Sequence, residues 1–276
     1  MGIIDKIKSN AWEKGIIVED DTAKKIRNLF NNMFYLPKSI EEEAKFVKQV
    51  MTRGQESQER KGLHASNMLV SENEFCLRSQ VLSLLYKQNQ GEQLQPGLLR
   101  IFEQGNAIHE KWQRLFIRAG YGKAVDMDYT CYNKQYMMSF TPDAIISIPE
   151  IFNGEKAVVE IKSVNTFQFQ RMERHPSAYK QCYWYMHNKG IKHGIVLSED
   201  KNTQDFKIEV YDYDSKLVAP YIERAESIMY YYSRVIAEHK MVHRPEDAKS
   251  PDCKKCNECP TRDACWNIGM GRIKLN

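Results

Sequence analysis

The chain has 276 residues, 42% of them hydrophobic, and its 40 basic and 36 acidic residues leave a net charge of +4. That length fits one large domain, or a core with a smaller appendage, in an ordinary globular protein. No run reaches the roughly 20 apolar residues that a membrane-spanning helix needs, and residues 1–6 lack a secretory apolar core. We therefore expect no membrane partner and a cytoplasmic location, which would be the host cytoplasm for a phage-encoded protein.

The N-terminal part of the chain predicts helices and carries no chemical motif. Helical patterns cover residues 22–35 and 40–51, and a Leu-Pro step separates them. A polar segment with the composition of a linker or exposed turn follows. We therefore expect a helical N-terminal region in residues 1–62 and the main domain in residues 63–276.

The first chemical candidates lie on two predicted helices. Ser71 can cap one helix, with Glu74 completing a capping box, so that Cys76 would lie in its first turns. An isolated cysteine there is usually a small buried hydrophobe. A second, long amphipathic helix should carry His109 at the edge of its buried stripe, with Gly105 one turn earlier on the same face. Neutral histidine is a common metal ligand, although a lone histidine beside an apolar stripe is more often a core residue. The stripe consists of Leu98, Ile101, Phe102, Gly105, Ile108, Trp112 and Leu115.

A set of strands should follow this helix. Residues 125–132 predict a strand that pairs with residues 136–148, and residues 157–163 form the next strand after a turn. Residues 193–198 and 206–213 predict two more strands, and a long amphipathic helix follows them. The pattern predicts an α/β fold, in which helices pack against a sheet.

Three charged residues stand inside these apolar runs. Because side chains alternate along a strand, Glu160 and Lys162 share one face, while Val159 and Ile161 enter the other. If Asp143 comes from the adjacent strand, two carboxylates converge, and such a pair favours a bound cation. Oxygen ligands of this kind suit magnesium or manganese. A Glu-x-Lys tripeptide on a strand is usually a solvated ion pair, but a charge inside an apolar run is costly unless it is paired or metal-bound.

Gln181 and Tyr185 stand four residues apart on the helix predicted after the Glu-x-Lys strand, so they project from one face. Taken alone, such a pair usually serves helix packing. Basic and aromatic residues are interleaved before and within this helix, a mixture suited to phosphates and stacked bases, although solvated helix faces look similar. They are Phe167, Phe169, Arg171, Arg174, Tyr179 and Lys180.

The chain has seven cysteines, which in a reducing compartment argue for metal or cluster ligation before disulfides. Cysteine pairs spaced by two suit tetrahedral zinc, and a Cys-Pro step is typical of runs that hold iron-sulfur clusters, so spacing alone leaves both centres open. Cys131 and Cys182, within a strand and a helix, should be core residues. The cysteines of the final stretch are Cys253, Cys256, Cys259 and Cys265.

Four motifs follow one another along the chain: Gly105-x-x-x-His109, Pro142-Asp143, Glu160-x-Lys162 and Gln181-x-x-x-Tyr185. Together they resemble the RecB-type branch of the PD-(D/E)XK nuclease superfamily. The resemblance implies a restriction-endonuclease-like core with a mixed central β-sheet flanked by helices. Lys162 would be the catalytic lysine, and Gln181 and Tyr185 would shape the site or contact DNA. The metal ligands that the resemblance implies are His109, Asp143, Glu160 and the backbone carbonyl of Ile161.

The cysteines extend the resemblance to an iron-sulfur subgroup, which includes the AddB helicase-nuclease subunits and the exonucleases of CRISPR spacer acquisition. This subgroup has one cysteine before the nuclease core and three after it, the latter arranged C-x2-C-x5-C. Cys76, Cys256, Cys259 and Cys265 match the arrangement. The match implies a C-terminal tail that binds a structural 4Fe-4S cluster together with Cys76. Cys253 departs from the pattern, because the subgroup needs no fifth thiol.

The resemblance implies a manganese- or magnesium-dependent deoxyribonuclease with exonuclease action on single-stranded DNA ends. The chain carries no P-loop motif, so coupling to unwinding, recombination or CRISPR adaptation would need a helicase or other protein partners. Two alternatives belong to other classes. One is a DNA-binding accessory protein of recombination or CRISPR adaptation, for example encoded by a phage, and the other is a zinc-stapled binding module without catalysis. The set of Asp143, Glu160 and Lys162 argues against both, because binding alone has no use for a buried carboxylate cluster.

Overall fold

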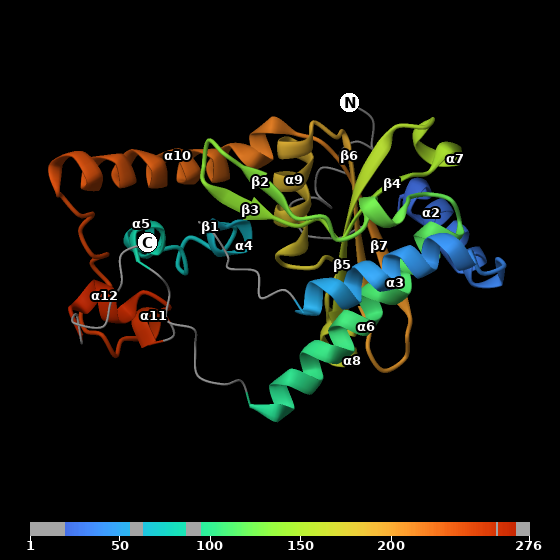
Figure 1. Cartoon of the computed structure of the whole chain (residues 1–276), viewed down its shortest axis with the longest axis horizontal. Coiled ribbons are helices and arrows are strands. Elements are labelled where there is room, and N and C mark those ends of the chain that lie inside the picture. Colours follow the sequence, from blue (N-terminus) through green and yellow to red (C-terminus); the bar gives the residue numbers. More distant parts are fainter. Residues whose placement is uncertain (1–19, 56–62, 87–94, 258, 269–276) are drawn as a thin grey trace, which may run out of the picture. The chain divides into compact units, whose positions relative to one another are not determined.

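The computed structural model describes residues 20–55, 63–86, 95–257 and 259–268, and the chain divides into two compact units (Figure 1). Unit 1 comprises Met1–Gln58, Gly97–Tyr129 and Thr141–Asp214, and unit 2 comprises Glu59–Pro96, Thr130–Phe140 and Ser215–Asn276. The expected linker lies for the most part outside the described residues. The division into a region 1–62 and a domain 63–276 therefore stays a prediction.

Unit 1 is built on a four-stranded mixed sheet in the order β4-β5-β6-β7. β5 and β6 run parallel, whereas β4 and β7 are antiparallel to the strand beside them. Parallel neighbours need a crossover connection, and here it contains two helices, α8 and α9. The strands are β4 (Ala144–Ser147), β5 (Lys156–Val164), β6 (His193–Asp200) and β7 (Phe206–Asp212), and the helices are α2 (Asp21–Asn32), η1 (Met33–Tyr35), α3 (Ile40–Gln55), α6 (Pro96–Arg118), η2 (Ala124–Asp126), α7 (Pro149–Phe152), α8 (Thr166–Arg171) and α9 (Ala178–Lys189).

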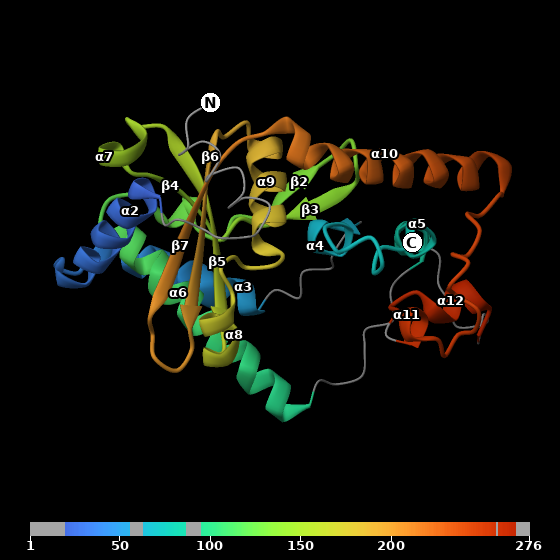
Figure 2. The same ribbon diagram turned by 180° about the vertical axis from the view of Figure 1, so that it is seen from behind.

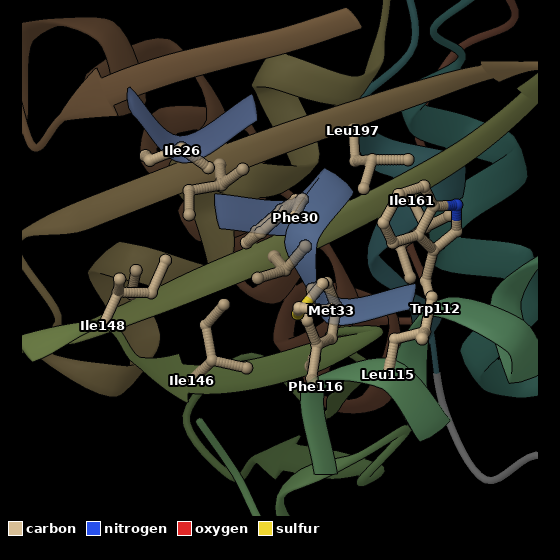
Figure 3. Packing of buried hydrophobic residues seen from close by; sticks show 14 of the residues in the cluster. Ile26, Phe30, Met33, Trp112, Leu115, Phe116, Ile146, Ile148, Ile161 and Leu197 are labelled. Carbon is tan, nitrogen blue, oxygen red and sulfur yellow. The ribbon is translucent and has the colours of Figure 1, made fainter. Parts of the chain in front are cut away.

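Helices cover both faces of this sheet, as the two opposite views show (Figures 1 and 2). On one face, Phe30 of α2 and Trp112 of α6 pack with Ile161 of β5 in a cluster of fully buried side chains (Figure 3). On the other face α9 approaches so closely that a Cβ on Gly194 would lie 2.5 Å from the Cys182 sulfur. Glycine at that position is therefore what permits the contact between α9 and β6. Both faces of β5 are thus covered, which explains why the strand is apolar almost throughout.

Unit 2 contains a small three-stranded sheet in the order β1-β3-β2. β1 runs parallel to β3, and β2 runs antiparallel to it. Arg224 of α10 ties the helix to the segment after β1, because its guanidinium donates hydrogen bonds to the carbonyls of Met68 and Val70 at 2.9 and 2.8 Å. The elements are β1 (Leu63–His64), α4 (Ala65–Met68), α5 (Leu77–Leu85), β2 (Cys131–Asn133), β3 (Met138–Phe140), α10 (Ser215–Glu238), α11 (Lys254–Asn257) and α12 (Arg262–Trp266).

The predicted α/β architecture is confirmed: a mixed sheet is flanked by helices, and the described N-terminal part is helical. This arrangement is consistent with the restriction-endonuclease-like core that the motifs imply. None of the described helices combines the length and apolarity that a bilayer crossing requires.

Two predictions about the strands are wrong. Residues 124–126 form the short helix η2 instead of the start of a strand, and only the end of the predicted segment enters β2. The expected long partner strand over residues 136–148 is split into β3 and β4, which belong to different sheets. Pro142 lies between them, and its missing amide hydrogen and fixed φ interrupt the ladder there.

Two predictions about the helices are also corrected. Ser71 and Glu74 do bond, with the Ser71 hydroxyl 2.6 Å from a Glu74 carboxylate oxygen, but they close a turn. The helix α5 begins only at Leu77, so Cys76 is its N-cap residue. In α6 the buried stripe begins at Ile108, whereas the first turns of the helix extend past the sheet and expose their apolar residues (Figure 1). The exposed residues are Leu98, Leu99, Ile101 and Phe102.

Candidate functional site

Asp143 occupies the position directly before β4, where the sheet register brings it beside β5. Ala144 pairs with Val159, so Asp143 falls opposite Glu160 in the antiparallel ladder. One Asp143 carboxylate oxygen accepts a hydrogen bond from the Ile161 amide at 2.6 Å. The Asp143 carbonyl accepts another from the Gln113 side chain at 2.7 Å. Main chain and side chain of this acid are therefore both fixed by neighbours in the core.

His109 reaches the same place from α6. Its Nδ1 lies 3.1 Å from the second Asp143 carboxylate oxygen. One turn earlier, a Cβ on Gly105 would lie 3.3 Å from the Ser163 hydroxyl, so glycine helps α6 to lie close against β5. Burial opposes protonation of His109, but the Asp143 carboxylate outweighs it and raises the pKa of the imidazole.

Glu160 and Lys162 project from the same face of β5, as the alternation of side chains along a strand predicted. Lys162 Nζ donates to Glu160 Oε1 at 2.5 Å. Glu160 Oε2 is buried and has no hydrogen-bond partner among the described residues. Unpartnered buried oxygens are rare, because each loses its hydration without compensation.

The two carboxylates differ in their protonation. Burial raises the pKa of Glu160 to about 7, and the Asp143 charge adds to this, while the Lys162 ammonium opposes it. Burial acts in the same sense on Asp143, but there the His109 imidazole and the Lys162 ammonium prevail and lower its pKa. Lys162 keeps its charge, since the two carboxylates raise its pKa despite burial. The site therefore combines a firmly ionised acid with one that titrates near neutrality.

These groups, two carboxylates and an imidazole with one carboxylate oxygen unpartnered in the described part of the chain, are of the kinds that bind divalent cations in proteins. As the side chains are placed, no three His, Cys, Asp or Glu residues in the described ranges lie close enough together to hold a metal ion. The contacts explain this, because His109 is bonded to Asp143 and Lys162 to Glu160. A cation would replace these two contacts. The Ile161 amide, rather than its carbonyl, makes the contact with Asp143, and a ligand role for the carbonyl stays a prediction.

Gln181 and Tyr185 lie on the α9 side of the sheet. Gln181 Nε2 donates to the Tyr185 hydroxyl at 3.4 Å. Tyr185 is only 1% exposed, and burial together with the nearby Glu160 charge raises the pKa of its hydroxyl well above the usual value. A side chain so placed does not offer a surface to DNA, so the geometry favours a role in shaping the site over direct substrate contact.

Other residues near the site were not singled out from the sequence. Gln113 holds the Asp143 carbonyl, and its position on the buried stripe of α6 was the available signal. Ser198 pairs with Lys162 across β5 and β6, and its buried hydroxyl has no hydrogen-bond partner in the described part of the chain. Glu199, fully buried on the opposite face, accepts hydrogen bonds from Lys111 at 2.6 Å and from the Trp112 indole at 2.5 Å. A hydrophilic run at a strand end gives no sign of these different environments.

The four predicted cysteines line one cavity of unit 2, although no three of them lie close enough together, as placed, to hold a metal ion. A single cavity is lined by Cys76 at the start of α5, Cys256 of α11, Cys259, and Cys265 of α12. Cys253 is not among the lining residues, although its carbonyl accepts a hydrogen bond from the Cys256 amide at 2.9 Å. Burial raises the pKa of Cys76, with the neighbouring Cys259 and Cys265 adding to the effect. Burial and then the contact with Cys253 raise the pKa of Cys256 to about 11.

Two residues of α5 are hydrogen-bonded to sulfurs of this cavity. Arg78 Nε donates to Cys265 Sγ at 3.1 Å, and the Ser79 hydroxyl lies 3.3 Å from Cys259 Sγ. Positive charge and hydrogen bonds of this kind stabilise thiolates and tune iron-sulfur centres. Cys131 and Cys182 are buried elsewhere, which agrees with their predicted place in the core.

No protein-family model matches the chain, and no curated protein matches it either. Among solved structures, the alkaline exonuclease LHK-Exo in complex with dAMP is 14% identical, with a TM-score of 0.47 over 65% of this chain and 91% of that one. The same exonuclease from Laribacter hongkongensis gives 13% identity and a TM-score of 0.44 over 64% of this chain and 90% of that one. The structure of SSO0001 is 12% identical, with a TM-score of 0.42 over 78% of this chain and 91% of that one. Likeness at this level does not assign the chain to a family.

Proposed function

We propose that the chain is a metal-dependent DNA nuclease of the PD-(D/E)XK type. The observation that carries the proposal is the convergence of His109, Asp143, Glu160 and Lys162 at the β4–β5 ladder, with Glu160 Oε2 buried and unpartnered. A buried group without a partner is retained at a cost in stability, and such a cost is expected where a ligand completes the site.

The residues fit a hard divalent cation. Asp143 and Glu160 offer carboxylate oxygens, and His109 offers a nitrogen. Magnesium or manganese bound there would activate a water and neutralise charge on the scissile phosphate. Asp143 stays ionised and oriented through the Ile161 amide, while Lys162 keeps a positive charge that would attract an anionic phosphate.

The finer assignments rest on the motif resemblance. We infer exonuclease action on single-stranded ends with a 5′-phosphate product, and DNA as the main partner, with helicase, recombination or CRISPR-adaptation proteins as further partners. In unit 2 we propose a structural 4Fe-4S cluster held by Cys76, Cys256, Cys259 and Cys265, with Zn²⁺ as the alternative. Four thiols around one cavity, with Arg78 and Ser79 hydrogen-bonded to two of them, support a metal centre.

The proposal is tested with end-labelled single- and double-stranded DNA and anaerobically purified protein in manganese or magnesium. Glu160→Gln and Asp143→Asn should each lower cleavage by at least about 100-fold, because each removes an anionic ligand. The matched control is Glu155→Gln, since Glu155 is exposed and pairs with Lys192 at 2.7 Å. It should cleave like the wild type. Wild-type cleavage by Glu160→Gln, in a preparation that unfolds at the wild-type temperature, would show that the carboxylates do not catalyse.

A further inference from the structure

The short helix α8 follows directly on the strand that carries Glu160 and Lys162. β5 ends at Val164 and α8 begins at Thr166, with Asn165 between them as the helix N-cap. Phe167 is only five positions after Lys162, so their Cα atoms are at most about 17 Å apart. Whatever α8 binds is therefore held close to the candidate nuclease site.

The beginning of α8 is fixed in place by the loop that joins β6 to β7. The Thr166 hydroxyl donates to the buried Asp200 carboxylate at 2.9 Å and accepts from the Asn202 side chain at 2.8 Å. Asn165 accepts from the Gln168 amide at 2.8 Å, which satisfies one of the free amides of the first turn. These bonds attach the helix to the sheet through side chains as well as through the main chain.

The end of α8 is fixed by β7. Lys207 donates from its ammonium to the carbonyls of Phe169 and Met172 at 2.6 and 3.0 Å. The same ammonium lies 4.6 Å from the centre of the Phe169 ring. Cations at a helix C-terminus are favourable because the last carbonyls lack partners within the helix. A helix of six residues would not be stable alone, and these contacts make it a rigid part of unit 1.

The outer face of this rigid helix carries an aromatic ring and a guanidinium in contact. Phe167 is 61% exposed, and the Arg171 guanidinium lies 3.6 Å from the centre of its ring. In the described parts of the chain no carboxylate lies within ion-pair distance of Arg171. Its charge therefore remains available to an anionic partner, and the stacked pair presents a flat cationic surface.

We propose that the pair of Phe167 and Arg171 is a stacking platform for a base of single-stranded DNA entering the nuclease site, an inference that rests on the proposed function. The chemistry matches, since aromatic rings stack on any base and arginine adds charge attraction to the adjacent phosphate. The rigid anchoring of α8 matches as well, because an ordered platform loses little conformational freedom when it binds. Paired bases in a duplex do not expose their faces, so the platform selects single strands.

The test uses full-length Glu160→Gln, in which binding can be followed without cleavage, and a fluorescent single-stranded oligonucleotide. Adding Phe167→Ala should weaken binding roughly 5- to 150-fold, the range for loss of one stacked base. Phe167→Trp should restore binding, and its indole fluorescence should be quenched by the DNA. A strand with an abasic residue at the platform should bind the Phe167 protein and the Phe167→Ala protein equally.

The matched control is Tyr230→Ala. Tyr230 of α10 is also exposed, and the guanidinium of Arg234, four residues later, lies 5.9 Å from the centre of its ring. Arg234, however, forms an ion pair with Glu238. Its replacement should leave binding unchanged. Equal affinity of the Phe167 and Phe167→Ala proteins for single strands, or an equal loss for duplex DNA, would overturn the platform. Neither result touches the proposed function, which fails if wild-type protein with metal leaves DNA intact or if Glu160→Gln cleaves like the wild type.

Discussion

The candidate nuclease site of unit 1 and the cysteine site of unit 2 are held in place by different means. His109, Asp143 and Glu160 sit on elements that share one apolar core, with Trp112 and Ile161 fully buried between them. Sheet register sets the position of both acids. The arrangement therefore exists before any ligand binds, and its charges are balanced by one another.

The cysteine site has little core of its own. α11 and α12 have four and five residues. In the described tail, residues 239–257 and 259–268, the buried residues are Ala248, Cys256 and Thr261. Burial of so few side chains stabilises a segment of this length very little. The difference teaches that the core of unit 1 places its candidate site without a ligand, whereas in unit 2 a ligand of the proposed kind would be needed to place the chain.

The largest effect is expected from removing a thiol of the cavity. Cys76→Ser should abolish the visible absorbance of a cluster and lower the free energy of unfolding, because the centre links α5 to a tail far along the chain. In the chain-entropy model a crosslink closing so long a loop is worth about 4 to 5 kcal/mol. Iron and sulfide analysis, with urea unfolding of anaerobic protein, measures both.

Cys253→Ser is the matched control for Cys76→Ser. Cys253 lies outside the cavity lining but contacts Cys256, so a local set of the four tail cysteines is the competing assignment. We expect Cys253→Ser to keep the metal and the stability. Colour lost with Cys253→Ser and kept with Cys76→Ser would reject the long-range set. The metal centre would then not link α5 to the tail, and unit 2, like unit 1, would be folded without help from its ligand.

A smaller effect is expected from pH in unit 1. The pKa of Glu160 is raised from 4.5 to about 7, so the folded state holds its proton more tightly than the unfolded chain. The resulting stabilisation is complete below pH 4.5 and is lost as the pH rises through 7, by at most about 3 kcal/mol. The raised pKa of His109 acts in the same direction. These two groups should therefore make metal-free protein less stable between pH 4.5 and 7.5, whereas burial lowers the pKa of His175 to about 4 and acts in the opposite sense. The difference between urea titrations of wild type and Glu160→Gln measures the Glu160 contribution.

Glu160→Gln should remove the loss of stability that Glu160 contributes between pH 4.5 and 7.5, whereas Glu155→Gln should keep it. Metal binding needs the ionised Glu160, so stabilisation by manganese should grow over the same pH range. Identical profiles of wild type and Glu160→Gln would mean that Glu160 is ionised throughout, and that Lys162 outweighs its burial. The candidate nuclease site would then lower the stability of the fold by less than the buried, unpartnered oxygen of Glu160 indicates.

The sequence predicted the parts of both sites that depend on periodicity and spacing. Glu160 and Lys162 share a face because strand alternation is a local rule, and α6 brings His109 to Asp143 because its stripe has the helical period. The split of the segment 136–148 depends on which sheet each half joins, a tertiary choice that no local pattern carries. The burial of Tyr185 is likewise set by how closely α9 approaches β6, and the exposure of Phe102 by where the sheet ends.

The smallest effect is expected from the pair of Gln181 and Tyr185, which tests how finely the core positions the nuclease site. Tyr185→Phe removes the hydroxyl that accepts from Gln181 at 3.4 Å and leaves the buried ring in place. A hydrogen bond of this length contributes about 1 kcal/mol, so kcat/KM should fall by at most about tenfold, with metal affinity unchanged. Tyr183→Phe is the control, because Tyr183 lies two residues earlier and faces another direction on α9. Calorimetry with manganese decides between the roles. If Tyr185→Phe weakened metal binding as much as Asp143→Asn does, the hydroxyl would belong to the ligand set, and the site would depend on its ligand as the cysteine site does.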